Sequence, residues 1–264
     1  AQREPDGRRR MLPSQFEPSG AAAGTVAWVL DGETPAHAGR QVSILFAPKV
    51  EGTRWVRPHG GAWDPVTQTI KRESYSVRLA GGVFSALIPA GMEESILSAL
   101  VYSSGQTGWV TENGEPADVR LVADGPVRTV VSVHRKLKGG TEYEKRYAFY
   151  AKHFTVDASV TGATTGCICR AFYTKGGQFE DDKGHRAAID GKGDAEDVSG
   201  ANPGVRWYAV YADKWAHSCV ALSPASNLTY WDSGAMGGIS LDAADAADYR
   251  VAYVIHEGRP DASF

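Results

Sequence analysis

Apolar and polar side chains alternate along much of this chain. In the segment 75–79, Tyr75, Val77 and Leu79 fall on one face, while Ser76 and Arg78 fall on the other. A period of two is typical of a strand that is buried on one side. Similar apolar or alternating runs, ended by turn residues, predict strands at 25–30, 41–46, 70–79, 83–88, 96–102, 119–122, 127–134, 142–150, 154–161, 167–173, 205–211, 219–223, 229–231 and 249–256.

The order of these runs predicts an antiparallel architecture. The runs at 128–134 and 142–150 are joined by Lys138-Gly139-Gly140, which favours a hairpin, and a turn at 151–153 leads into a third strand. We therefore expect a meander of three strands. The only helix-like stretch is the alanine-rich segment 241–248. Because amphipathic helices do not separate the strands, an alternating βαβ fold is disfavoured. The pattern predicts an all-β fold, a large antiparallel β-sandwich with an N-terminal β segment.

The length of 264 residues suits one large β-fold or two smaller units. We interpret residues 1–11 as an extended or disordered N-terminus, 12–66 as a β segment and 67–264 as the β-sandwich. Two stretches break the strand pattern. Residues 47–67 are rich in glycine, proline, tryptophan and basic side chains, and residues 176–203 are rich in glycine, aspartate and glutamate. Long irregular segments are usually functional or disordered, so both are candidate site regions.

Composition narrows the classes of partner. Hydrophobic residues make up 42% of the chain, which allows a sizeable core, and the formal net charge is −3. Beyond the arginines at 8–10 no basic cluster is evident, which argues against a nucleic-acid partner. No apolar run approaches the length of a membrane span, so no membrane contact is expected. Residues 1–10 lack the apolar centre of a signal peptide, as does any chain from which such a peptide has been cleaved.

The cysteines point to no metal site. Cys167 and Cys169 are too close in sequence for an unstrained disulfide. One of them could pair with Cys219, or all of these thiols could be reduced. Their spacing does not match that of zinc ligands. We interpret them as small buried hydrophobic residues.

Several of the predicted strands resemble galactose-mutarotase-like β-supersandwich domains. The segment 68–79 with Gly81-Gly82 is similar to their opening strand, in which a Tyr-x-Val-x-Leu pattern precedes a glycine turn. The segment 124–133, with its GPVR sequence, and the runs at 143–150 and 154–160 resemble a strand and hairpin of secreted carbohydrate-active enzymes, among them exo-rhamnogalacturonan-lyase-like proteins. The runs at 205–212 and 219–223 are similar to later sandwich strands. The resemblance implies a saccharide partner and a secreted or periplasmic location.

The first candidate site lies in the stretch 47–67, with Arg54, Trp55, Arg57, His59 and Trp63. Elimination at a uronate requires a cation at the carboxylate and a base that removes the C5 proton. Arginine and histidine suit these roles, and tryptophan offers a flat apolar face to a sugar ring. The alternative is a surface loop whose tryptophans cover a sheet edge.

The second candidate site lies on the strand predicted at 142–150. Arg146 and Tyr150 share one face of this strand, and the other face carries Tyr143, Tyr147 and Phe149. One face should belong to the core and the other to water or a cleft. Arg146 and Tyr150 are therefore a candidate sugar-facing pair. The alternative is a tyrosine–arginine ladder on a half-exposed sheet.

The remaining candidates for sugar contact are Arg170, Tyr173, His185, Trp215 and His217. His185 belongs to the acidic stretch, whose clustered oxygens could hold Ca²⁺, although their spacing does not fit an EF-hand. A solvated loop is the alternative there. Trp215 and His217 suit either a sugar platform or a turn packed on the sandwich.

The leading functional hypothesis is β-elimination at an acidic polysaccharide. His59 or Tyr150 is then the base, Arg57 or Arg146 binds the carboxylate, and Trp55 and Trp215 form the sugar platform. A glycoside hydrolase or sugar epimerase on the same fold, a non-catalytic carbohydrate-binding module and a structural assembly protein are the alternatives. No nucleophile elbow, phosphate-binding loop, dinucleotide fingerprint or HExxH zinc motif is visible. The oligomeric state is left open.

Overall fold

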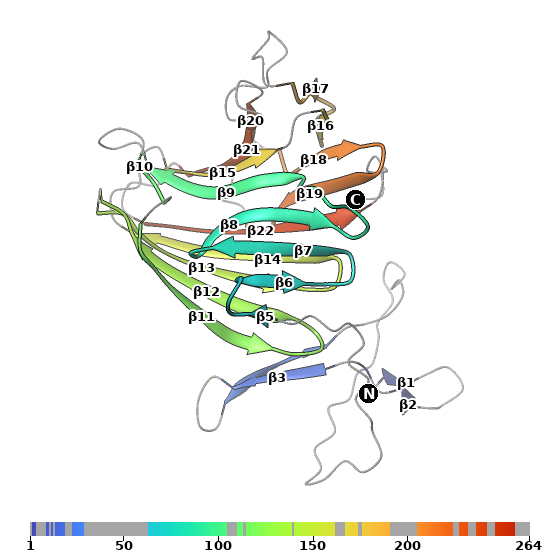
Figure 1. The fold of residues 1–264 in the computed structure, drawn as a ribbon, viewed down its shortest axis with the longest axis vertical. Coiled ribbons are helices and arrows are strands. Elements are labelled where there is room, and N and C mark those ends of the chain that lie inside the picture. The colour runs from blue at the N-terminus through green and yellow to red at the C-terminus, as the bar shows by residue number, and fades with distance from the viewer. Residues whose placement is uncertain are drawn as a thin grey trace.

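The computed structural model describes residues 2–3, 9–10, 12, 14–18, 23–28, 63–104, 110–112, 115–138, 140–161, 167–173, 176–190, 205–223, 227–231, 236–241 and 246–256. Their regular structure consists entirely of antiparallel strands, as Figure 1 shows. The prediction of an all-β sandwich is therefore confirmed. None of the described residues belongs to a helix that could span a membrane.

Within the part of the chain that the structure describes, the first large sheet has nine strands. Its spatial order is β20-β21-β15-β9-β8-β7-β6-β5, and β10 pairs with β9. Its strands are β5 (Trp63–Asp64), β6 (Thr69–Lys71), β7 (Tyr75–Ala80), β8 (Val83–Pro89), β9 (Leu97–Ser104), β10 (Val110–Thr111), β15 (Cys167–Tyr173), β20 (Asn227–Trp231) and β21 (Met236–Leu241).

Nine of the described strands form the second large sheet, in the order β11-β12-β13-β14-β22-β19-β18-β16-β17. Its first four strands form a continuous meander, which contains the three-stranded meander predicted from the sequence. Its strands are β11 (Ala117–Asp124), β12 (Thr129–Lys136), β13 (Glu142–Phe149), β14 (His153–Thr161), β16 (Gln178–Asp181), β17 (Arg186–Ala188), β18 (Trp207–Ala212), β19 (Trp215–Ala221) and β22 (Ala246–His256).

The core lies between the two sheets and is rich in aromatic rings. Phe154 of β14 stacks on Phe84 of β8 at a centroid distance of 5.2 Å and on Tyr253 of β22 at 4.9 Å. Phe84 also packs against Tyr147, 6.2 Å away on the second sheet. These side chains are fully buried because each strand turns alternate residues inward. The face predicted to carry Tyr143, Tyr147 and Phe149 is the core face, as expected.

A separate hairpin precedes the sandwich. Strand β3 (Ser14–Pro18) pairs with β4 (Gly24–Trp28), and β3 runs beside the end of the second sheet near β11 (Figure 1). A short pair, β1 (Gln2–Arg3) and β2 (Arg9–Arg10), lies within the segment expected to be extended or disordered. Strand β5 pairs with β6 across the expected boundary at 66/67, and the proposed division into segments stays a prediction.

The alanine-rich segment 241–248 is not helical in its described part. Strand β21 ends at Leu241 and β22 begins at Ala246, where Ala246 and Ala247 pair with Thr161 and Val160 of β14. The high helix propensity of alanine is overridden by the backbone ladder of a central strand. The acidic stretch 176–203 contains β16 and β17, and the strand predicted at 41–46 lies outside the described residues.

Candidate functional site

The outer face of the second sheet carries rows of polar side chains. Directly opposed residues of antiparallel strands share a face. The register places Ser132, Arg146, Asp157 and Arg250 in one row across β12, β13, β14 and β22. The next row on the same face consists of His134, Glu144, Ser159 and Asp248. The outer face therefore carries charges of both signs, whereas the inner face of the same sheet packs in the aromatic core.

An open groove of about 630 Å³ follows these rows. Arg250 forms a two-point ion pair with Asp157, with Nη2 donating to Oδ2 at 3.0 Å. These hydrogen bonds raise the pKa of Arg250 above its usual value. The groove is lined by Glu144, Arg146, Asp157, Ala158, Ser159, Leu222, Ser223, Asp248, Tyr249 and Arg250.

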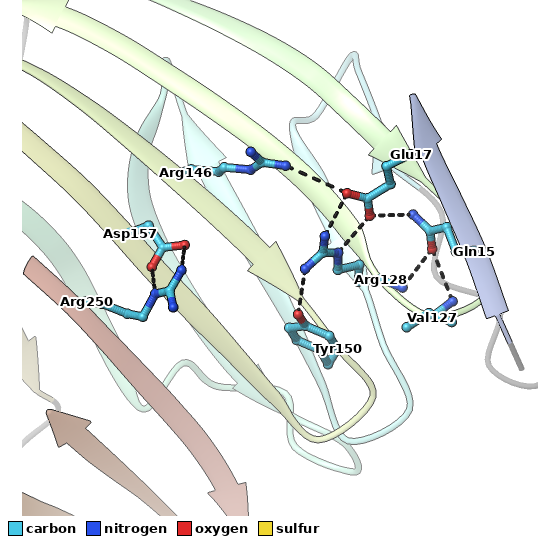
Figure 2. Close-up of polar contacts among 8 residues, drawn as sticks. All are labelled: Gln15, Glu17, Val127, Arg128, Arg146, Tyr150, Asp157 and Arg250. Carbon is cyan, nitrogen blue, oxygen red and sulfur yellow. Dashed lines mark hydrogen bonds and ion pairs between the residues drawn. The ribbon is translucent and has the colours of Figure 1, made fainter. Parts of the chain in front are cut away.

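A second group of charges adjoins this row and centres on Arg128 (Figure 2). The Arg128 guanidinium donates to both carboxylate oxygens of Glu17, at 2.7 Å from Nε and 2.6 Å from Nη2. Its Nη1 donates to the Tyr150 hydroxyl at 2.8 Å. Arg146 approaches the same carboxylate, with Nη2 lying 3.7 Å from Oε2 of Glu17. The hydrogen bonds to Glu17 raise the pKa of Arg128, so this cation stays charged.

Tyr150 is held by its surroundings. Its ring stacks on His153 at a centroid distance of 4.5 Å, and burial lowers the pKa of His153. The backbone oxygens of Tyr150 and His153 are hydrogen-bonded to the hydroxyl of Tyr75, at 2.9 and 2.8 Å. Because Tyr75 is a core residue of β7, the turn that carries Tyr150 is attached to the first sheet.

These groups give the outer face a defined chemistry. Two guanidinium groups, Arg128 and Arg146, converge on one carboxylate next to a phenol, and a guanidinium fork matches a carboxylate at two points. The groove beside them adds the carboxylates of Glu144, Asp157 and Asp248. The site can therefore hold an anion at one end and can offer hydrogen-bond acceptors along its length.

The predicted pair Arg146 and Tyr150 belongs to this site. Other predicted residues lie elsewhere. Trp63 is half-buried in β5 and packs against the core, and Trp215 is half-buried in β19. Trp215 lines a separate groove of about 600 Å³ together with Met92, Gly176, Gln178, Tyr211, Ala212, Asp213 and Lys214.

Tyr173 and His217 lie in the core rather than on an open face. Tyr173 is 4% exposed and His217 is 0% exposed, and their rings are 5.0 Å apart. Arg170 lies in β15, opposite Val101 and Gly238. Trp55, Arg57 and His59 lie outside the described residues.

His185 lies in the turn between β16 and β17. Its Nδ1 is 2.8 Å from Oδ2 of the buried Asp181, while Arg186 forms an ion pair with Glu180 at 3.1 Å. Among the residues that the structure describes, no group of three or more His, Cys, Asp or Glu side chains is arranged to hold a metal ion. Because 191–200 lie outside that set, Ca²⁺ binding stays a prediction.

The sequence interpretation missed Glu17, Arg128, His153, Asp157 and Arg250. Asp157 and Arg250 fall at outward positions of strands that were predicted, so strand alternation could have identified them. Their meeting depends on the pairing of β14 with β22, which lie far apart in the sequence. Glu17 had no such signal, because 14–18 was not predicted as a strand.

Comparisons with known proteins show the fold of this chain. No family model matches it, and no curated protein matches it significantly. Its structure is similar to that of an alpha-mannosidase from Enterococcus faecalis V583, with a TM-score of 0.58 and 8% identity over 74% of this chain and 30% of that chain. A glycosyl hydrolase family 38 protein from Enterococcus faecalis matches with a TM-score of 0.55, 8% identity and the same coverage.

A galactose mutarotase-like protein from Lactobacillus casei aligns over 75% of this chain and 100% of that chain, with 10% identity and a TM-score of 0.42. The chain spans about 30% of the length of the mannosidase and of the family 38 protein, whose fold it shares. The expected kinship with exo-rhamnogalacturonan-lyase-like proteins stays a prediction. We conclude that the chain has a β-sandwich fold that also occurs within larger glycoside-processing enzymes.

Proposed function

We propose that this protein is carbohydrate-active and that an acidic saccharide lies along the outer face of the second sheet. The observation that carries this proposal is the convergence of Arg128 and Arg146 on one carboxylate at the end of a groove lined by Asp157 and Arg250. A guanidinium pair of this kind suits the carboxylate of a uronic acid. The sandwich shared with the mannosidase is consistent with it. A secreted or periplasmic location, implied by the sequence resemblance, belongs to the same proposal.

The finer proposal is β-elimination. In this reaction a base removes the C5 proton of a uronate while a cation neutralises its carboxylate. The C4–O bond breaks, a double bond forms between C4 and C5, and the departing oxygen takes up a proton from water. We assign the cation role to Arg146 and Arg128, and the base role to Tyr150, whose hydroxyl lies 2.8 Å from Arg128. His59 and Arg57 stay candidates for the same roles.

The test is incubation with pectic, alginate and ulvan-type polymers, with and without Ca²⁺, while the ultraviolet absorbance of the unsaturated product is followed. We expect Tyr150→Phe to lower the rate at least about 100-fold, the effect of removing a general base. Tyr211→Phe, on the separate groove with Trp215, is the matched control and should keep the wild-type rate. Absence of product from every polymer contradicts the lyase proposal.

A hydrolase or epimerase is the second candidate, because Glu144, Asp157 and Asp248 line the same groove. Glycoside hydrolysis commonly uses a pair of carboxylic acids. New reducing ends without an ultraviolet chromophore would favour a hydrolase. Saccharide binding without any product, retained after each histidine is replaced by alanine, would favour a binding module.

A further inference from the structure

We propose that Arg128, Arg146 and Tyr150 form a carboxylate-binding site that Glu17 fills as an internal ligand. In this proposal Glu17 exchanges with an external carboxylate, and the β3–β4 hairpin moves away when it does. The identity of that carboxylate as a uronic acid rests on the proposed function. The existence of an exchangeable anion site does not.

The contacts of Glu17 are those of a bound carboxylate. Both of its oxygens accept hydrogen bonds from Arg128, and Gln15 Nε2 donates to Oε1 at 3.1 Å. The side chain of Glu17 is only 8% exposed, whereas that of Arg146 is 47% exposed. Arg146 is therefore open to solvent on the side that faces the groove, and a ligand can reach it without displacing core residues.

The hairpin that supplies Glu17 is a separate two-stranded sheet and belongs to neither large sheet. Among the described residues, strand β3 has β4 as its ladder partner and pairs with no strand of the sandwich. Phe16 and Trp28 are 62% and 40% exposed, so both rings keep a large part of their surface in contact with water, although Leu12, just before β3, is 3% exposed. An isolated two-stranded hairpin is marginally stable in water, and its docking depends on a few side-chain contacts.

Those docking contacts are centred on two residues of β3. The Gln15 Oε1 accepts hydrogen bonds from the backbone N–H groups of Val127 and Arg128, at 3.3 and 3.1 Å. Glu17 supplies the ion pair with Arg128 (Figure 2). The hairpin can therefore leave without breaking any backbone ladder of the two sheets.

Charge balance decides what can replace Glu17. When Glu17 leaves, Arg128 and Arg146 lose the carboxylate between them. The nearby carboxylate of Asp157 does not replace it, because Asp157 is already paired with Arg250. An incoming carboxylate restores the two-point contact with Arg128, whereas a neutral sugar leaves two neighbouring cations unpaired. The same arrangement directs the sugar ring of a uronate toward the groove that Arg146 lines.

The test compares the wild-type chain with Glu17→Gln, using isothermal titration with D-galacturonate, D-glucuronate and the neutral sugars galactose and glucose. Because the internal carboxylate no longer competes, we expect the variant to bind uronates at least about tenfold more tightly. Binding of the neutral sugars should not change. Asp118→Asn, which removes an exposed carboxylate paired with Arg120 on β11, is the matched control and should behave like the wild type.

Two further variants keep the test decisive. Glu17→Gln combined with Arg128→Gln should lose the gain in uronate affinity. Gln15→Ala, which weakens docking but keeps the carboxylate, should give a smaller gain. Backbone hydrogen exchange at 24–28 should be faster in Glu17→Gln, and faster in the wild type when galacturonate is added. Circular dichroism confirms that each variant is folded.

Equal uronate affinities of wild type and Glu17→Gln, or tight binding that persists in the double variant, would overturn the inference. The polymer assay is separate from this result. Uronate binding by Glu17→Gln without any polymer product contradicts only the proposed enzyme activity. Polymer cleavage with no effect of Glu17→Gln contradicts only the internal-ligand inference.

Discussion

His217 is an imidazole at the centre of the sandwich, between Tyr173 and Tyr253. Neither of its ring nitrogens has a hydrogen-bond partner among the residues that the structure describes. Burial, with a smaller contribution from His256, lowers its pKa to about 3. The folded protein therefore keeps this side chain neutral over most of the acidic range.

This pKa shift predicts acid sensitivity. Unfolded histidine takes up a proton near pH 6.5, whereas folded His217 does so only near pH 3, so its contribution to stability is complete above about pH 6.5 and is lost as the pH falls. As the pH falls from about 6 to about 4, the free energy of unfolding should decrease in both proteins. We expect this decrease to be about 2–3 kcal/mol smaller in His217→Leu than in the wild type. Urea denaturation across this range measures the difference. Identical pH dependence of the two proteins would contradict the prediction.

At the scale of elements, the turn between β7 and β8 of the first sheet packs against the second sheet. Gly82 has a φ of +81°, and a Cβ there would lie 2.9 Å from Val119 and 3.1 Å from Val133 of the second sheet. Gly81 has a φ of +59°, but a Cβ there would meet no described atom within 4 Å. A side chain at Gly81 would therefore cause backbone strain alone, whereas a side chain at Gly82 would cause backbone strain and steric crowding.

We expect Gly82→Ala to lower the free energy of unfolding by about 2–4 kcal/mol, from backbone strain together with crowding in the core. Gly81→Ala, the matched control, should cost only about 1 kcal/mol because strain acts alone. Urea denaturation of both variants measures the two values. Equal losses would show that the close approach of Gly82 to Val119 and Val133 is unimportant.

Strand alternation predicted most elements of the two sheets, including the meander β12–β14 and the inward face of β13. It did not predict Lys145 on that inward face. Lys145 is buried because its Nζ lies 2.8 Å from Oε1 of Glu112, a residue from another part of the chain. Local pattern records the period of a strand, but it does not record a distant partner that makes a buried charge tolerable.

The same limit applies to the candidate site. Arg146 and Tyr150 could be identified because they share one strand face. Arg128 and Glu17 could not, because their ion pair depends on where the β3–β4 hairpin docks. A contact between residues far apart in the sequence forms only when the whole sandwich has packed, so the local pattern does not reveal it.

At the scale of the whole molecule, Phe154 connects the sheets. It packs against Phe84 and Tyr75 of the first sheet and against Phe149 and Tyr253 of the second. We expect Phe154→Ala to lower the free energy of unfolding by about 3–5 kcal/mol. Because other core contacts such as Phe84 with Tyr147 still join the two sheets in this variant, far-ultraviolet circular dichroism and tryptophan fluorescence should still report one coincident transition. Two separate transitions would contradict a shared core.

The place of β22 has a consequence for how the molecule assembles. This strand lies between β14 and β19, so it joins the meander to the rest of the second sheet. The backbone ladder between β14 and β22 joins residues near 155 to residues near 250, so it can form only after both segments are present and have met. Non-local pairing of this kind slows folding to about milliseconds to seconds. Until then β14 and β19 present unpaired edges to other chains, and this interval is when aggregation competes with the native fold.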